Sequence, residues 1–162
     1  MIEASIGELQ GRCKKPVPRV YIEPREDDGA EEKLALNFAA TWTRLPLGVR
    51  RKLRRYWDSC TIAFLSPSMT VEDSNLEDAE LAVCTKMGHR LVFRPSAVAH
   101  LPDLVLQDLI AHELAHSHQW ATGWLVIQVD GNLPKEEIES DADERIAEWG
   151  FAPDSVRCHY KK

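Results

Sequence analysis

The sequence predicts a mixed α+β domain that is richer in helices than in strands. Three observations carry this prediction. Apolar residues recur at three- and four-residue steps over long segments, short β-prone runs alternate with turn residues, and prolines and glycines stand where segments begin and end. A length of 162 residues suits one domain with its own hydrophobic core. We expect an N-terminal arm over residues 1–27 and a single domain over residues 28–162.

Patterns in the first half of the chain predict a strand, two helices and a second strand. A β-prone triplet stands between prolines in the arm, where it can form an edge strand. An apolar stripe then indicates a helix that Pro46 ends or kinks, and the next helix carries a basic run opposite Leu53 and Trp57. The apolar run before Ser66-Pro67 reads as a short buried strand. These elements cover residues 20–22, about 30–45, about 47–57 and 61–65.

A β-hairpin is the clearest feature in the middle of the chain. Two apolar runs, over residues 79–85 and 90–94, are separated by a polar connector that contains Gly88. The acidic stretch before them, residues 72–78, reads as a surface loop. We therefore expect a small antiparallel sheet.

Two helices are predicted after the hairpin. Pro102-Asp103 opens the first, with proline in the first turn and an acid at the positive end of the helix dipole, and Gly123 is a natural C-terminal cap. The apolar residues 124–129 read as a short strand or a packed loop. A further proline opens the last helix, over about residues 134–149.

Charge and composition exclude several classes of function. A net charge of −6 argues against a nucleic-acid partner, and the basic run over residues 50–55 reads as the solvated face of a helix. The sequence shows no apolar stretch long enough to span a bilayer and no basic-then-apolar start, so we expect a cytoplasmic protein without a membrane partner. The four cysteines form no Cys-x-x-Cys pair, which favours free thiols and leaves two disulfides as the alternative.

The string His-Glu-Leu-Ala-His, residues 112–116, lies well inside the helix that follows the hairpin. Four residues apart on a helix, His112 and His116 present their imidazoles one turn above each other on one face. Glu113 is rotated by roughly 100° from His112, so its carboxylate can stand beside a metal without binding it. Zinc lowers the pKa of a bound water, and such a carboxylate can then act as general base in peptide hydrolysis. The alternative is a chance match on an ordinary amphipathic helix.

A catalytic zinc site of this kind needs a third protein ligand, and the last predicted helix is rich in carboxylates. Apolar residues at three- and four-residue steps mark the buried stripe of that helix. Glu139 and Asp143 flank this stripe and share one face, and Glu136 lies on nearly the same side. These acids are the candidates, against the alternative of a solvated acidic face. The buried stripe consists of Ile138, Ala142, Ile146 and Trp149.

With these two helices the chain resembles the gluzincin metallopeptidases, in which a His-Glu-x-x-His helix is followed by a helix that supplies a glutamate ligand. Residues 139–143 match the Glu-x-x-Ala-Asp pattern of membrane and cytosolic peptidases of this group. They are also close to the Glu-x-x-Ala-Asn variant of regulatory proteases that cleave phage-type repressors. The resemblance implies a minimal zincin-like fold and a Zn²⁺ cofactor bound by His112, His116 and Glu139. It also implies that Asp143 fixes the tautomer of one ligand histidine.

The resemblance covers about residues 80–150, and the chain departs from the family in two ways. Membrane-bound members carry transmembrane helices, and repressor-cleaving members often carry sensor or DNA-binding modules; we expect neither here. By analogy with the family, the hairpin strand over residues 91–94 would bind an extended peptide by strand addition.

Three further histidines are weaker candidates for metal ligands. His118 follows the motif, but it sits more than half a turn from His116 and faces away from the metal, so it reads as a surface or capping residue. His89 and His100 fall in expected loops and have no partner pattern.

The predicted function is zinc-dependent hydrolysis of peptide bonds in a protein or peptide substrate, with Glu113 as general base. Arg157, His159 and Tyr160 lie where zincins often place a donor that stabilises the oxyanion, and the alternative for them is an ordinary surface tail. The main alternative function is a zincin-like regulatory or interaction module that binds zinc with little or no turnover, which the intact Glu113 disfavours. A third reading is cleavage of one specific partner. The sequence carries no indication of an oligomeric state.

Overall fold

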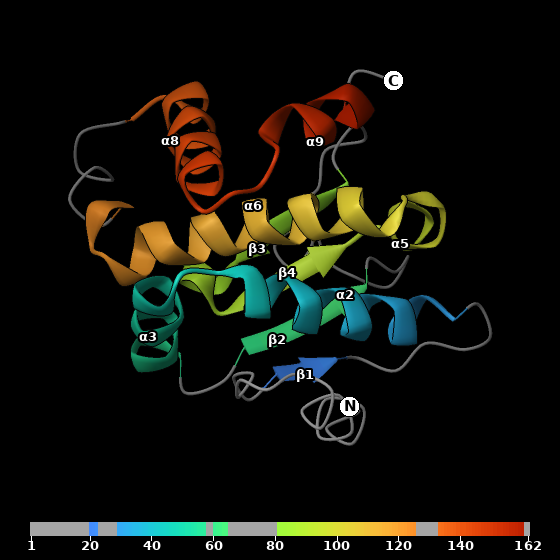
Figure 1. Ribbon diagram of the computed structural model, residues 1–162. Helices are drawn as coiled ribbons and strands as arrows, with labels where there is room; N and C mark the ends of the chain where they lie inside the picture. Colours follow the sequence, from blue (N-terminus) through green and yellow to red (C-terminus); the bar gives the residue numbers. More distant parts are fainter. Residues whose placement is uncertain (1–19, 23–28, 58–59, 65–80, 126–132, 161–162) are drawn as a thin grey trace.

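The computed structural model describes residues 20–22, 29–57, 60–64, 81–125 and 133–160. The fold is mixed α+β, as the sequence predicts, with helices arranged around one small sheet (Figure 1). The strands are β1 (Val20–Ile22), β2 (Cys60–Phe64), β3 (Ala82–Thr85) and β4 (Arg90–Phe93). The helices are α2 (Ala30–Arg44), α3 (Leu47–Tyr56), the short turn η1 (Lys86–Gly88), α5 (Pro95–His100), α6 (Asp103–Ala121), α8 (Lys135–Glu148) and α9 (Pro153–Tyr160).

The described strands form one sheet in the order β1-β2-β4-β3. β1 pairs in parallel with β2, β2 pairs in parallel with β4, and β3 and β4 run antiparallel as a hairpin. The hairpin is therefore confirmed, but the prediction of a small antiparallel sheet is wrong. The reason is the connection between β1 and β2. It contains α2 and α3, and a connection of this length crosses the sheet and returns the next strand in the same direction.

β4 is an interior strand of this sheet. Because it lies between β2 and β3, neighbouring strands use both of its backbone edges. The prediction that residues 91–94 bind a peptide by strand addition is therefore wrong, since strand addition requires an unpaired edge. Among the described strands, β3 forms the edge on that side of the sheet. β1 forms the opposite edge, as the sequence predicts for residues 20–22.

Helix α6 is the centre of the helical layer. In Figure 1, α2 runs along one side of α6 with the sheet behind them, and α8 and α9 lie on the other side of α6. α6 begins after Pro102 and ends at Ala121, and Gly123 follows with a φ of 76°. This left-handed conformation suits glycine at the end of a helix, so the predicted start and stop of this helix are confirmed.

Polar side chains hold α2 against α6. The Asn37 amide donates to the Asp103 carboxylate at 3.1 Å, and the Gln107 amide donates to Asn37 at 3.1 Å. The Arg44 guanidinium donates to the Gln107 carbonyl oxygen at 3.0 Å. Because the surrounding contacts of the two helices are apolar, these directional bonds fix the register of α6 on α2.

The hairpin turn η1 is pressed against α6. Gly88 has a φ of +87°, and a Cβ atom built on it would lie only 2.9 Å from the Ser117 Cα atom. The Gly88 carbonyl accepts hydrogen bonds from Ser117 Oγ and from Trp57 Nε1, each at 2.8 Å. Only glycine permits both this backbone conformation and this approach. The turn thus ties the sheet to the helix that carries the His-Glu-Leu-Ala-His string.

The sequence patterns do not predict the short helix α5. His100 is the last residue of α5, so its expected position in a loop is wrong, whereas His89 lies in a turn as expected. Of the apolar residues 124–129, the structure describes Trp124 and Leu125, which are helical. Residues 126–129 and the expected acidic loop over residues 72–78 lie outside the described part of the chain.

Helix α9 is the second helix that the patterns do not predict. It follows Gly150, whose φ of 90° ends α8, and it returns the chain to α6. The Asp108 carboxylate on α6 accepts from the Ala152 N–H at 3.1 Å and from Ser155 Oγ at 2.6 Å. These bonds anchor the first turn of α9 on α6. The helix they anchor carries Arg157.

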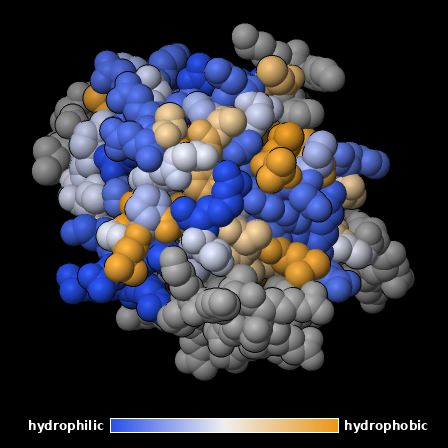
Figure 2. Space-filling view, in the orientation of Figure 1, coloured by the Kyte–Doolittle hydropathy of each residue, from blue (hydrophilic) through white to orange (hydrophobic). Residues whose placement is uncertain are grey.

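The surface gives no sign of a membrane-spanning element: in the described ranges, no helix is both long and apolar enough to cross a bilayer. On the face drawn in Figure 2, hydrophobic residues form small separate groups among hydrophilic ones. Three cysteines fall in the described part of the chain, and all three carry free thiols. They are Cys60, Cys84 and Cys158.

Candidate metal centre

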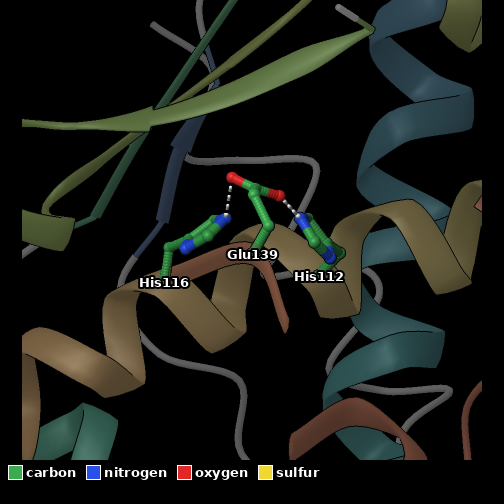
Figure 3. A group of neighbouring side chains, drawn as sticks. All are labelled: His112, His116 and Glu139. Carbon is green, nitrogen blue, oxygen red and sulfur yellow. Dashed lines mark hydrogen bonds and ion pairs between the residues drawn. The ribbon is translucent and has the colours of Figure 1, made fainter. Parts of the chain in front are cut away.

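Two helices bring three potential metal ligands together. His112 and His116 project from α6, and Glu139 projects from α8, so that the carboxylate lies between the two imidazoles (Figure 3). One nitrogen of each histidine and one oxygen of the glutamate lie within 4.8 Å of one another. The structure therefore brings together the three residues for which the sequence and the resemblance predict a shared ion.

The separations suit a small cation with tetrahedral coordination. His112 Nε2 lies 2.9 Å from Glu139 Oε2, and His116 Nε2 lies 3.4 Å from Glu139 Oε1. Bonds of about 2.0–2.1 Å at the tetrahedral angle place neighbouring ligand atoms about 3.3 Å apart. Because both histidines present the same nitrogen, Nε2, to the carboxylate, one ion could bind all three groups after small side-chain movements.

The group is buried on the α6 side and open on the other. The His112 and His116 side chains are 7% and 12% exposed, whereas the Glu139 side chain is 42% exposed. A cavity of about 360 Å³ opens beside Glu139, between α8 and α9. A cation bound here would keep a coordination position accessible from this cavity. The cavity is lined by His112, Lys135, Glu136, Glu139, Ser140, Asp143, Val156 and Arg157.

Asp143 and Arg157 support His112. Asp143 Oδ1 lies 3.1 Å from His112 Nδ1, the nitrogen that faces away from Glu139. The other oxygen of Asp143 accepts a hydrogen bond from the Arg157 guanidinium of α9. A carboxylate on Nδ1 keeps the proton on that nitrogen and leaves Nε2 free to bind a cation. This arrangement matches the role that the resemblance implies for Asp143.

Gln119 supports His116 in a similar way, and the sequence reasoning missed it. Gln119 Oε1 lies 2.8 Å from His116 Nδ1, and the Gln119 side chain is completely buried. Its spacing of three residues from His116 puts it on the same face of α6, which is the signal that could have found it. The amide also reaches α8, where it donates to the Ile138 carbonyl at 2.9 Å and to the Asp141 carboxylate at 2.8 Å.

The electrostatics of the group favour positive charge between the side chains. Burial alone would lower the pKa of His112, but hydrogen bonds to Asp143 and Glu139 and the nearby charge of Glu113 outweigh it and raise that pKa to about 10. Burial alone would raise the pKa of Glu139, yet its bonds to His112 and His116 hold that pKa well below its usual range. The site thus binds a proton tightly, and a metal cation would compete for the same place.

Glu113 lies beside the three ligands but is not one of them. It is 2% exposed, and its charge raises the pKa of both His112 and the Cys84 thiol. Cys84 belongs to β3, so the carboxylate lies near both the candidate ligands and the edge strand. Burial first, and then the charge of Glu113, raise the pKa of Cys84 to about 12, although a hydrogen bond with Ser117 opposes this. Cys84 is therefore a neutral thiol within range of the charge of Glu113, the general-base candidate.

His118 contacts Arg145 and Trp149 and not the three candidate ligands. Its Nδ1 lies 2.8 Å from the Arg145 guanidinium, and its ring packs edge-on against Trp149 with centroids 5.3 Å apart. Burial, followed by the charges of Arg145 and Lys52, lowers the pKa of His118 to about 4. Because an arginine can only donate, His118 Nδ1 must accept, and His118 is not part of the three-residue group.

The structure separates the candidates for oxyanion stabilisation. Arg157 lines the cavity beside Glu139 and contacts Asp143, so it lies at the site. The backbone of His159 and Tyr160 ends α9, but their side chains lie outside the described part. Glu136 also lines the cavity without joining the three-residue group.

Comparison with known proteins adds no assignment. No family model, no curated protein and no solved structure matches this chain. The case for a function is therefore carried by the residues and their geometry.

Proposed function

We propose that this protein is a zinc-dependent peptidase with a minimal zincin-like fold. The observation that supports it most is the shared direction of the two imidazoles. Both Nδ1 atoms face acceptors of the protein, Asp143 and Gln119, while both Nε2 atoms face the Glu139 carboxylate. Two lone pairs and a carboxylate directed at one point repel each other unless a proton or a metal cation lies between them, and a metal cation can bind all three groups at once.

The donor set favours zinc over calcium and magnesium. Two imidazole nitrogens and one carboxylate oxygen make up a ligand set typical of catalytic zinc, whereas calcium and magnesium prefer oxygen donors alone. The open side at Glu139 leaves room for a fourth ligand, which a structural site would supply from the protein.

The residues around the ligands suit hydrolysis. A zinc ion held by His112, His116 and Glu139 supplies Lewis-acid activation of a water and of a substrate carbonyl. Glu113, buried next to this group, takes the proton of the attacking water and passes it to the leaving amine. Asp143 and Gln119 accept hydrogen bonds from the two Nδ1 atoms, so that both Nε2 atoms remain the positions for the ion. Arg157 lies at the cavity, where its guanidinium is the described candidate for stabilising the oxyanion.

The substrate is proposed to be a peptide in extended conformation. Among the described strands β3 forms the sheet edge nearest the group, and its residue Cys84 is close enough to Glu113 to feel its charge. A peptide paired with this edge would pass near Glu113 and the cation. Strand addition therefore moves from β4, where the sequence reasoning put it, to β3.

Metal analysis of the purified protein tests the proposal. We expect the wild type to bind one equivalent of zinc and to cleave a peptide library. Glu113→Gln should keep the zinc and lose cleavage, because its carboxylate acts on the proton and not on the metal. Glu139→Ala should lose both, whereas the matched control Glu144→Ala, an exposed acid of the same helix, should lose neither. A wild type without zinc, or a Glu139→Ala variant that retains it fully, would contradict the proposal.

The alternative function is a module that binds zinc with little or no turnover. It predicts the same metal content but no cleavage by the wild type, and no difference between the wild type and Glu113→Gln. The same experiment therefore separates the two functions.

A further inference from the structure

The buried side chain of Gln119 is connected to both helices of the candidate metal centre. It belongs to α6, yet its amide nitrogen donates to two acceptors of α8, the Ile138 carbonyl at 2.9 Å and the Asp141 carboxylate at 2.8 Å. Ile138 immediately precedes the candidate ligand Glu139 in the chain. The Gln119 amide thus contacts both the helix that carries the two histidines and the helix that carries the glutamate.

The two donors fix the orientation of the Gln119 amide. A backbone carbonyl and a carboxylate can only accept, so the NH₂ group must face α8 and the carbonyl oxygen must face His116. Asp141 is itself held in place by the Arg145 guanidinium, whose Nε lies 2.6 Å from the same carboxylate oxygen. The orientation of the amide therefore follows from its neighbours and not from His116.

The fixed amide in turn fixes the tautomer of His116. Because Gln119 Oε1 can only accept, His116 Nδ1 must carry the hydrogen at a separation of 2.8 Å. In the neutral ring, Nε2 is then the nitrogen with the lone pair, and it is the nitrogen that faces Glu139. His118, on the same helix, shows the opposite assignment, because its Nδ1 accepts from Arg145.

We infer that Gln119 is a positioning residue that holds His116 in its metal-binding tautomer and joins the two ligand-bearing helices. This inference rests on the proposed zinc site. Gln119 accepts from His116 Nδ1 through a neutral amide, just as Asp143 accepts from His112 Nδ1 through a charged carboxylate. An amide adds no negative charge to the site, so the centre is less negative than it would be with two supporting acids.

Histidine tautomers and zinc affinity together test this inference. In metal-free wild type labelled with ¹⁵N-histidine, two-dimensional NMR should show the His116 hydrogen on Nδ1. In Gln119→Leu the hydrogen should move to Nε2 in a large part of the molecules. The zinc affinity, measured by competition with a chelator, should fall about 10- to 100-fold, as is usual when a group that supports a ligand is removed.

Two further variants separate positioning from mere stability. Gln119→Glu loses the donors to α8 but keeps an acceptor for His116, so it should keep the Nδ1 hydrogen. Gln107→Leu removes another buried glutamine of α6, one that bonds Asn37 and Arg44, and should leave both the tautomer and the zinc affinity unchanged. If Gln119 had a structural role alone, Gln119→Glu and Gln119→Leu would lower the zinc affinity to the same extent, and neither would change the tautomer of His116.

The inference is overturned if His116 carries its hydrogen on Nε2 in the wild type, or if Gln119→Leu leaves tautomer and affinity as they were. It is also overturned if Gln107→Leu lowers the zinc affinity as much as Gln119→Leu. Absence of zinc binding in the wild type would refute the proposed function instead. The NMR measurement would still decide the role of Gln119, because it is made without metal.

Discussion

Replacing Gly88 by alanine probes the contact that ties the hairpin to α6. The change has two costs. A left-handed backbone costs a residue with a side chain about 1–2 kcal/mol, and the new Cβ atom would lie 2.9 Å from the Ser117 Cα atom. That neighbour is backbone of a central helix and cannot rotate away, so overpacking adds about 1–3 kcal/mol. We expect the free energy of unfolding to fall by about 2–5 kcal/mol in total.

Gly150→Ala is the matched control for this variant. Gly150 has a φ of +90°, close to the +87° of Gly88, but a Cβ atom there would meet nothing within 4 Å. The free energy of unfolding of Gly150→Ala should therefore fall only by the backbone cost of about 1–2 kcal/mol. The reduced entropy of the unfolded chain favours both alanine variants equally and cancels in the comparison.

Urea denaturation measures the difference between the two variants. With a slope of about 2 kcal/mol per molar urea, the steric cost corresponds to a midpoint about 0.5–1.5 M lower for Gly88→Ala than for Gly150→Ala. Equal midpoints would refute the reasoning, because they would show that a Cβ atom on residue 88 fits beside the Ser117 backbone without a steric cost.

Three further predictions follow from the candidate site. Asp143→Ala removes the acceptor of His112 Nδ1, and we expect zinc affinity in a chelator competition to fall about 10- to 100-fold; an unchanged affinity would contradict the role of Asp143. In metal-free protein the pKa of His112 is raised from 6.5 to about 10, so the stability that His112 contributes is complete below pH 6.5 and is lost as the pH rises towards 10. The urea midpoint of the wild type should therefore approach that of His112→Asn over this range, and a constant difference would speak against it. Cys84 is partly buried and its pKa of about 12 keeps the thiol protonated, so mass spectrometry after brief alkylation at pH 8 should find label on the exposed Cys158 and little on Cys84 until urea is added.

Much of the helical part of the fold could be predicted from local sequence. α6 and α8 have a proline before their first turn and a glycine after their last, and each carries an apolar stripe, so their bounds follow from chain-local physics. α9 also begins with a proline, Pro153, and an acid, Asp154, but it is only eight residues long. Its position on α6 depends on bonds to Asp108, more than forty residues earlier in the chain. No local pattern contains such a partner.

The direction of the strands could not be predicted from the hairpin alone. Local periodicity indicates that a segment is extended, but the pairing partner depends on how the intervening helices return the chain. The order of strand, two helices and strand between residues 20 and 64 was the available sign of a parallel crossover.

In the candidate site, too, local sequence predicts some residues, whereas others depend on how the helices pack. The spacing of His112 and His116 follows from one helical turn, and the carboxylate face of α8 narrows the third position to a few acids. The position of Glu139 between the imidazoles depends on how α8 crosses α6, which the sequence indicates only through the resemblance. Gln119 was missed because an amide is not a metal ligand, and its role shows only when its three partners are seen together.

The order of the site along the chain has a consequence for synthesis. A ribosome releases the sheet and α2 first, then α6 with both histidines, and only later the helices with Glu139 and Arg157. A nascent chain that has emerged as far as α6 holds two ligands and the general-base candidate, but no glutamate to complete the group. In the proposed function, the three-ligand site, and any cleavage that depends on it, exists only after α8 has left the ribosome and docked on α6. The helix that is made later therefore sets the earliest time at which the proposed activity can begin.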